Sequence, residues 1–146
     1  MNQFQESLNE LIIENNLNKL KLAQILGISS NTLSGYFVKN YYPRIEIAIK
    51  MCNYFDCSLD YLFGITDKRK PEYTFDNSKL LNNFNNNLKS LFKKNNLSVA
   101  SAMKAMQLDE YTYYNWKKGK FPNTTNILVV SKFFGVSIDF LLGHEC

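Results

Sequence analysis

The sequence predicts an all-α protein made of two tandem five-helix domains joined by a short linker. The chain repeats itself: LNELIIENNL at 8–17 matches LKSLFKKNNL at 88–97, and YFDCSLDYLFG at 54–64 matches FFGVSIDFLLG at 133–143. Matches of this length in the same order indicate two copies of one module. Within each copy apolar residues recur at helical spacing, and no segment alternates as a strand would. A length of 146 residues suits two small domains.

The two copies set the expected domain boundaries. The first domain covers 1–65 and the second covers 79–146. The segment between them, TDKRKPEYTFDNS at 66–78, is charged, contains Pro71 and lacks helical periodicity. It is therefore expected to be a short, semi-extended linker, although Tyr73 and Phe75 could pack onto a domain.

The first helix of the first copy is indicated by an apolar stripe at helical spacing. This stripe consists of Phe4, Leu8, Leu11 and Ile12. The opposite face carries three acids four residues apart, which are expected to face solvent: Glu6, Glu10 and Glu14.

Capping residues predict the other helices of both copies. An Asn or Ser caps the second helix, a turn follows, a Ser or Asp caps the third, a Pro opens the fourth, and a Ser caps a last helix that stops at a Gly. In the first copy these residues are Asn18, Gly27, Ser29, Pro43, Ser58 and Gly64. In the second copy they are Ser98, Gln107, Asp109, Pro122, Ser137 and Gly143.

Composition and residue usage argue against several classes of function. No run approaches the ~20 apolar residues needed to span a bilayer, and the N-terminus MNQFQESLNE is too polar and acidic for a signal peptide, so a cytoplasmic protein is expected. The three cysteines lack CxxC spacing, and His144 with Cys146 offers only two ligands, so no metal and no cofactor are expected. Without a glycine-rich phosphate loop or another catalytic constellation, an enzyme is not expected.

Basic residues gather in the second half of the chain. The net charge is +4. Residues 1–64 carry five basic and six acidic side chains, 65–78 carry three of each, and 79–146 carry nine lysines against four acids. The positive charge hints at an anionic partner, and the second domain carries most of it.

Two segments resemble a known family of helix-turn-helix proteins. They are LKLAQILGISSNTLSGYF at 20–37 and AMKAMQLDEYTYYNWKKGKFP at 102–122. A short helix, a glycine-type turn and a capped second helix are typical of this motif. Both segments resemble the Cro-like, phage-repressor family, also called xenobiotic-response-element type. The closing SLDYLFG and SIDFLLG are similar to that family's last helix.

The resemblance implies that the third helix of each copy enters the DNA major groove and touches base edges. The implied reading positions are Ser30, Asn31, Ser34 and Gly35 in the first copy and Glu110, Tyr111, Tyr114 and Asn115 in the second. Thr32 and Thr112 fall near the DNA backbone. The positions expected on the inward side are Leu33, Tyr36, Tyr113 and Trp116.

The chemistry of these residues suits DNA. Asn can pair with adenine, and Glu can accept a hydrogen bond from cytosine. Lysines and an arginine at the same edge could neutralise phosphates, each adding about −0.9 to the salt slope. They are Lys19, Lys21, Lys39 and Arg44 in the first copy and Lys117, Lys118 and Lys120 in the second. Two alternatives stay open: the second set could be a solvated helix end that complements the helix dipole, and Tyr111 and Tyr114 could be buried filler or an exposed contact surface.

Two substitutions set the second copy apart. Met103 stands where the first copy has Ala23, and Gln107 stands where it has Gly27. A Gln at a turn position that favours positive φ would cost about 1 kcal/mol. The helix pair of the second copy could therefore meet at an altered angle, and the two copies need not do the same thing.

Two functions are compatible with the sequence. One is a sequence-specific regulator of transcription that binds double-stranded DNA: a repressor from a phage, plasmid or other mobile element, with two modules on two half-sites. The unequal reading residues then predict a non-palindromic site. The other is a protein-binding module on the same scaffold, such as an antirepressor or an inhibitor of a host defence nuclease, because a Tyr-rich face suits a protein interface. One copy could also bind DNA while the other binds protein, and a homodimer could form through a last helix.

Overall fold

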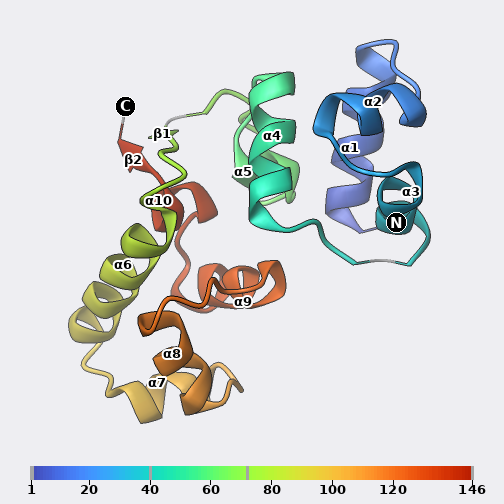
Figure 1. Ribbon diagram of the computed structural model, residues 1–146. Coiled ribbons are helices and arrows are strands. Elements are labelled where there is room, and N and C mark those ends of the chain that lie inside the picture. Colours follow the sequence, from blue (N-terminus) through green and yellow to red (C-terminus); the bar gives the residue numbers. More distant parts are fainter. Residues whose placement is uncertain (1, 40, 72, 146) are drawn as a thin grey trace. The chain divides into compact units, whose positions relative to one another are not determined.

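Helices dominate the computed structural model, which describes residues 2–39, 41–71 and 73–145 (Figure 1). The chain divides into two compact units, Met1–Pro71 and Glu72–Cys146. The described residues form ten helices and one pair of two-residue strands. The predicted all-α class is confirmed. Within the described residues, every helix is too short or too polar to span a bilayer.

The first unit holds five helices. They are α1 (Gln3–Glu14), α2 (Lys19–Leu26), α3 (Ser30–Val38), α4 (Ile45–Phe55) and α5 (Leu59–Leu62). The stripe predicted for the first helix is buried, since Phe4, Leu8 and Leu11 are each at most 1% exposed. One face of α4 is buried in the same core and contributes Ile45, Ala48, Ile49 and Cys52. Buried side chains of all five helices of the unit together form this core.

The second unit also holds five helices. They are α6 (Leu80–Lys94), α7 (Val99–Ala105), α8 (Glu110–Lys117), α9 (Thr124–Phe134) and α10 (Ile138–Leu142). Strand β1 (Tyr73–Thr74) pairs antiparallel with β2 (His144–Glu145), with Tyr73 opposite Glu145. The sequence showed no strand pattern, because two residues are too few to alternate. The side chain of His144 and all of Cys146, considered above as metal ligands, lie outside the described residues.

The predicted helix caps form through side-chain oxygens. Asn18 Oδ1 accepts from the backbone amide of Lys21 at 2.7 Å, and Ser98 Oγ accepts from Ser101 at 3.1 Å. Ser29, Asp109, Ser58 and Ser137 cap their helices in the same way. The prolines are the exception. Pro43 and Pro122 do not open α4 and α9 but precede the N-cap residues Arg44 and Asn123, which are extended. Each proline therefore lies in the chain entering the helix, outside its first turn.

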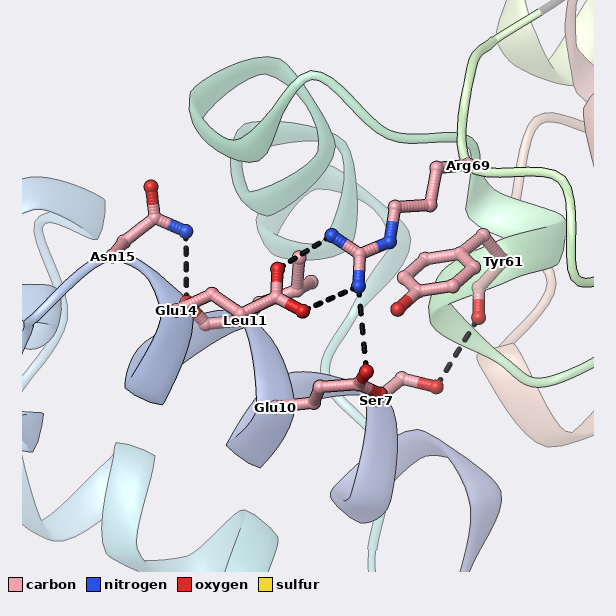
Figure 2. A network of polar contacts seen from close by, with 7 residues as sticks. All are labelled: Ser7, Glu10, Leu11, Glu14, Asn15, Tyr61 and Arg69. Carbon is pink, nitrogen blue, oxygen red and sulfur yellow. Dashed lines mark hydrogen bonds and ion pairs between the residues drawn. The ribbon is translucent and has the colours of Figure 1, made fainter.

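The acidic stripe predicted for α1 does face solvent, since Glu6, Glu10 and Glu14 are all exposed, and two of these acids also bind an arginine (Figure 2). Both oxygens of Glu14 contact the Arg69 guanidinium, at 2.5 and 2.6 Å, and Glu10 Oε1 lies 3.4 Å from it. The guanidinium also lies 5.0 Å from the centroid of the Tyr61 ring. The Arg69 guanidinium holds the pKa of Glu14 below its usual value.

The backbone beside Arg69 is attached to the first unit as well. The carbonyl of Arg69 accepts from the amide of Ser58 at 2.8 Å, and the amide of Ile65 donates to Asp60 at 2.8 Å. The first residues of the expected linker, 66–69, therefore pack against the first unit rather than extending freely from it.

Candidate nucleic-acid interface

The α2–α3 pair is joined by a tight turn. Gly27 ends α2 in the left-handed conformation, with φ of 71°, and the amide of Ile28 donates to the Ala23 carbonyl at 3.0 Å. Ser29 then caps α3 by accepting from the amide of Thr32 at 3.0 Å. These local bonds fix where α3 begins and leave its N-terminal side chains next to the turn.

The second unit builds the same turn with different residues. Gln107 has φ of 60°, and the amide of Leu108 donates to the Met103 carbonyl at 2.8 Å. Gln107 thus takes the conformation that glycine takes in the first unit, as expected, and it carries the strain that a side chain incurs there. Asp109 caps α8 by accepting from the amide of Tyr111 at 2.9 Å.

The larger side chain of Met103, which stands in place of Ala23, is accompanied by a smaller side chain at the preceding position. Ala102 stands where the first unit has Leu22, so the larger side chain moves by one position along the helix. All four side chains are buried, each at most 2% exposed. The interior of the second helix pair is therefore lined by different side chains.

In the first unit the predicted reading face is small and polar. Ser30, Asn31 and Ser34 are exposed along α3. Gly35 is not available for contact with a base, because the ring of Tyr41 lies over it and would collide with any added Cβ. The Thr32 hydroxyl lies 2.8 Å from that of Ser29, so the cap already engages it.

In the second unit the corresponding face is large and aromatic. Tyr111 is 65% exposed and Tyr114 is 43% exposed, so neither ring is core filler. Glu110 is exposed, whereas Thr112 and Asn115 are half-buried. The predicted inward residues are all buried: Leu33, Tyr36, Tyr113 and Trp116.

The basic residues expected to contact the DNA backbone are all exposed: Lys19, Lys21, Lys39, Arg44, Lys117, Lys118 and Lys120. Some already have partners within their unit. The Lys19 ammonium lies 4.2 Å from the Phe37 ring centroid, and the Arg44 guanidinium lies 4.0 Å from Glu46. Lys117 and Lys118 lie at the C-terminal end of α8, where they also complement the helix dipole. Both interpretations of these lysines are therefore compatible with their positions.

Sequence reasoning missed two polar residues that hold the third helices in place. The Gln5 side chain on α1 donates to the carbonyls of Tyr36 and Phe37, at 2.7 and 3.2 Å. In the second unit the Asn85 side chain on α6 donates to the Trp116 carbonyl at 3.1 Å. The only sequence signal was an amide side chain directly after Phe4 and after Phe84, on the apolar face of each first helix.

Two further features bear on the site's chemistry. Among the described residues, no group of three or more His, Cys, Asp or Glu side chains is arranged to hold a metal ion. Cys52 and Cys57 are buried in the first unit.

Comparison with known proteins gave one match. The sequence model of a helix-turn-helix family matches residues 8–62, which run from within α1 to the end of α5. The match supports the resemblance to this family for the first unit and suggests a DNA-binding helix-turn-helix regulator; the second unit lies outside the match. Neither the comparison with curated proteins nor that with solved structures gave a match.

Proposed function

We propose that the protein is a sequence-specific regulator of transcription that binds double-stranded DNA, with α3 and α8 in the major groove. The observation that carries this proposal is the helix-turn-helix match at 8–62, over a unit whose third helix presents Ser30, Asn31 and Ser34 to solvent. Short polar side chains let a helix approach base edges closely, and Asn can pair with adenine.

We propose further that the second unit is a copy of the same module. Equivalent contacts in the two units support this. Phe4 packs edge-on against Tyr36 at 6.2 Å, and Phe84 packs edge-on against Trp116 at 5.2 Å. Ser7 donates to the Tyr61 carbonyl on α5, and Asn87 donates to the Phe140 carbonyl on α10. Two such modules in one chain would occupy two half-sites, which raises the effective concentration of the second module once the first is bound.

The proposed role is that of a repressor from a phage or other mobile element. It rests on the resemblance of both segments to phage repressors and on the steric exclusion of other proteins from a bound DNA site. A protein that covers two neighbouring half-sites prevents other proteins from binding there.

The test is selection of binding sites from a random pool of double-stranded DNA by the intact chain. An enriched sequence supports the proposal, and no enrichment at low salt contradicts it. On an enriched site, replacing Lys117, Lys118 and Lys120 with Ala should make the salt slope shallower by up to about 2.7, since each phosphate contact contributes about 0.9. Lys132→Ala, another exposed lysine of the second unit, on α9, is the matched control and should leave the slope unchanged.

A second candidate function is a protein-binding module, and the exposed rings of Tyr111 and Tyr114 favour it. Exposed tyrosines are common at protein interfaces, because they bring a large contact area with few rotatable bonds. Tyr111→Ala and Tyr114→Ala distinguish the two functions. Weakened DNA binding supports a role in the groove, and unchanged DNA binding supports a surface for a protein partner.

A further inference from the structure

A buried amide side chain connects the start of α1 to the end of α3 in the first unit. Gln5 is 3% exposed. Its Oε1 accepts from the Asn2 amide at 2.8 Å, while its Nε2 donates to the Tyr36 and Phe37 carbonyls. Those carbonyls belong to the last turn of α3, where a helix leaves its own carbonyls without intrahelical partners. The Oε1 bond belongs to the N-terminal cap of α1, and the two Nε2 bonds hold α3 against α1.

In the second unit the residue that aligns with Gln5 is Asn85, and it also bonds the end of the third helix. Asn85 Nδ2 donates to the Trp116 carbonyl, which lies in the last turn of α8. In both units the residue before the amide is a phenylalanine whose ring packs edge-on against the side chain of the residue that accepts the bond. A ring contact and a directional hydrogen bond at adjacent positions fix both the distance and the rotation of the third helix.

The two amides differ in reach and in how fully they are bonded. Asn85 is one methylene shorter than Gln5, and its hydrogen bond reaches one carbonyl rather than two. Among the described residues, Asn85 Oδ1 is buried without a hydrogen-bond partner. The helix that carries Asn85 begins at Leu80 and has Lys79 as its N-cap. In α1 the N-cap Asn2 lies three residues before Gln5 and donates its backbone amide to that side chain, whereas the residue three positions before Asn85 is not an N-cap.

We infer that Gln5 and Asn85 are positioning residues that orient α3 and α8 and thereby influence base selectivity without contacting DNA. The part of this inference that concerns DNA rests on the proposed function. Bidentate pairing with a base requires both hydrogen bonds to align, so a small rotation of the helix weakens the correct pair more than it weakens phosphate contacts.

The first experiment needs no DNA, because Trp116 is the only tryptophan of the chain. Asn85→Leu keeps the size of the side chain and removes its donor. We expect a shifted Trp116 emission and greater quenching by acrylamide in a chain that still unfolds cooperatively. Asn85→Gln, which keeps the donor, should retain the wild-type emission and keeps the test informative if Asn85→Leu does not fold.

A matched control lies on the same helix. Asn87 Nδ2 donates to the carbonyls of Phe140 and Leu141, at 3.0 and 3.1 Å, and so attaches α6 to α10 rather than to α8. Asn87→Leu removes the same kind of bond and should leave the Trp116 emission unchanged. An equal response to both substitutions, or no response to Asn85→Leu, would overturn the positioning role.

The second experiment measures selectivity as the ratio of affinities for the enriched site and for random DNA. Gln5→Leu should lower this ratio by about tenfold, the size of one bidentate base contact, whereas Gln5→Asn should lower it less. Ser7→Ala, which removes the bond from α1 to α5, is the control and should leave the ratio unchanged. A loss of stability with an unchanged ratio would reduce Gln5 to a structural residue and overturn the inference. If Trp116 responds as expected but the wild-type chain enriches no DNA, the proposed function fails and the positioning of α8 is supported.

Discussion

Replacing Trp116 is the most direct test of how the second unit is held together. The indole is 2% exposed, and its ring lies 5.2 Å from that of Phe84 in an edge-on arrangement. A buried tryptophan covers roughly 150–250 Å², which corresponds to about 4–6 kcal/mol as an upper estimate. Measured losses for Trp→Ala in protein cores are about 3–5 kcal/mol. We expect Trp116→Ala to lower the free energy of unfolding of the second unit by the latter amount.

This loss is large compared with the total stability of the unit. A unit that runs from Glu72 to Cys146 is expected to have a free energy of unfolding of about 4–11 kcal/mol. Trp116→Ala should therefore remove about a quarter of it or more, and Trp116→Phe, which keeps a ring beside Phe84, should remove less. With a slope near 2 kcal/mol per M of urea, the midpoint of the second unit should fall by about 2 M.

Urea unfolding followed by far-ultraviolet circular dichroism measures the effect, because it requires no tryptophan. The transition of the first unit should not move. Tyr111→Ala, on the same helix but 65% exposed, is the control and should change stability by at most about 0.5 kcal/mol. If Trp116→Ala unfolds at the wild-type midpoint, the indole is not part of the core and the orientation assigned to α8 is wrong.

Further perturbations test the turn and the segment after α5. Gln107→Gly should raise the free energy of unfolding of the second unit by about 1 kcal/mol in the same assay, because glycine adopts a φ of 60° without strain; the reverse change, Gly27→Gln, should destabilise the first unit by a similar amount. Arg69→Met removes the guanidinium but keeps an apolar stem, so trypsin should cleave faster after the neighbouring Lys68, as measured by mass spectrometry. Acid should release the same ion pair: the pKa of Glu14 is lowered by Arg69, so the contribution of the pair is present above the usual 4.5 and is lost as the pH falls through the lowered pKa, which NMR titration of the Glu14 carboxyl measures.

Local features of the fold were predictable because their causes are local. Asn18 and Ser29 cap helices through residues three positions away, and those bonds can be read from spacing alone. The left-handed conformation of Gln107 followed from its alignment with Gly27 and from no long-range contact. Buried stripes such as that of α1 are also a matter of helical period.

The contacts that shape the candidate site are long-range, and the sequence does not reveal them. Arg69 and Glu14 are 55 positions apart, and Gln5 and Tyr36 are 31 apart. Arg69 belongs to a segment that composition marks as a linker, so its return to α1 could not be expected. Tyr41 lies over Gly35, and helical periodicity does not predict a contact with a residue beyond the end of the helix.

The two units are most alike on the inside and differ most on the third-helix face. The contacts that fix the third helix recur, with an aromatic ring and an amide from the first helix in each unit. Most exposed positions change, because Asn31 and Ser34 of α3 correspond to Tyr111 and Tyr114 of α8. Under the proposed function, one geometry then presents two chemistries. Unit 1 favours close approach to base edges, whereas unit 2 places bulky rings beside a cluster of lysines and should account for most of the salt dependence. A single palindromic site would serve only one of these surfaces well, so the selected DNA should be asymmetric.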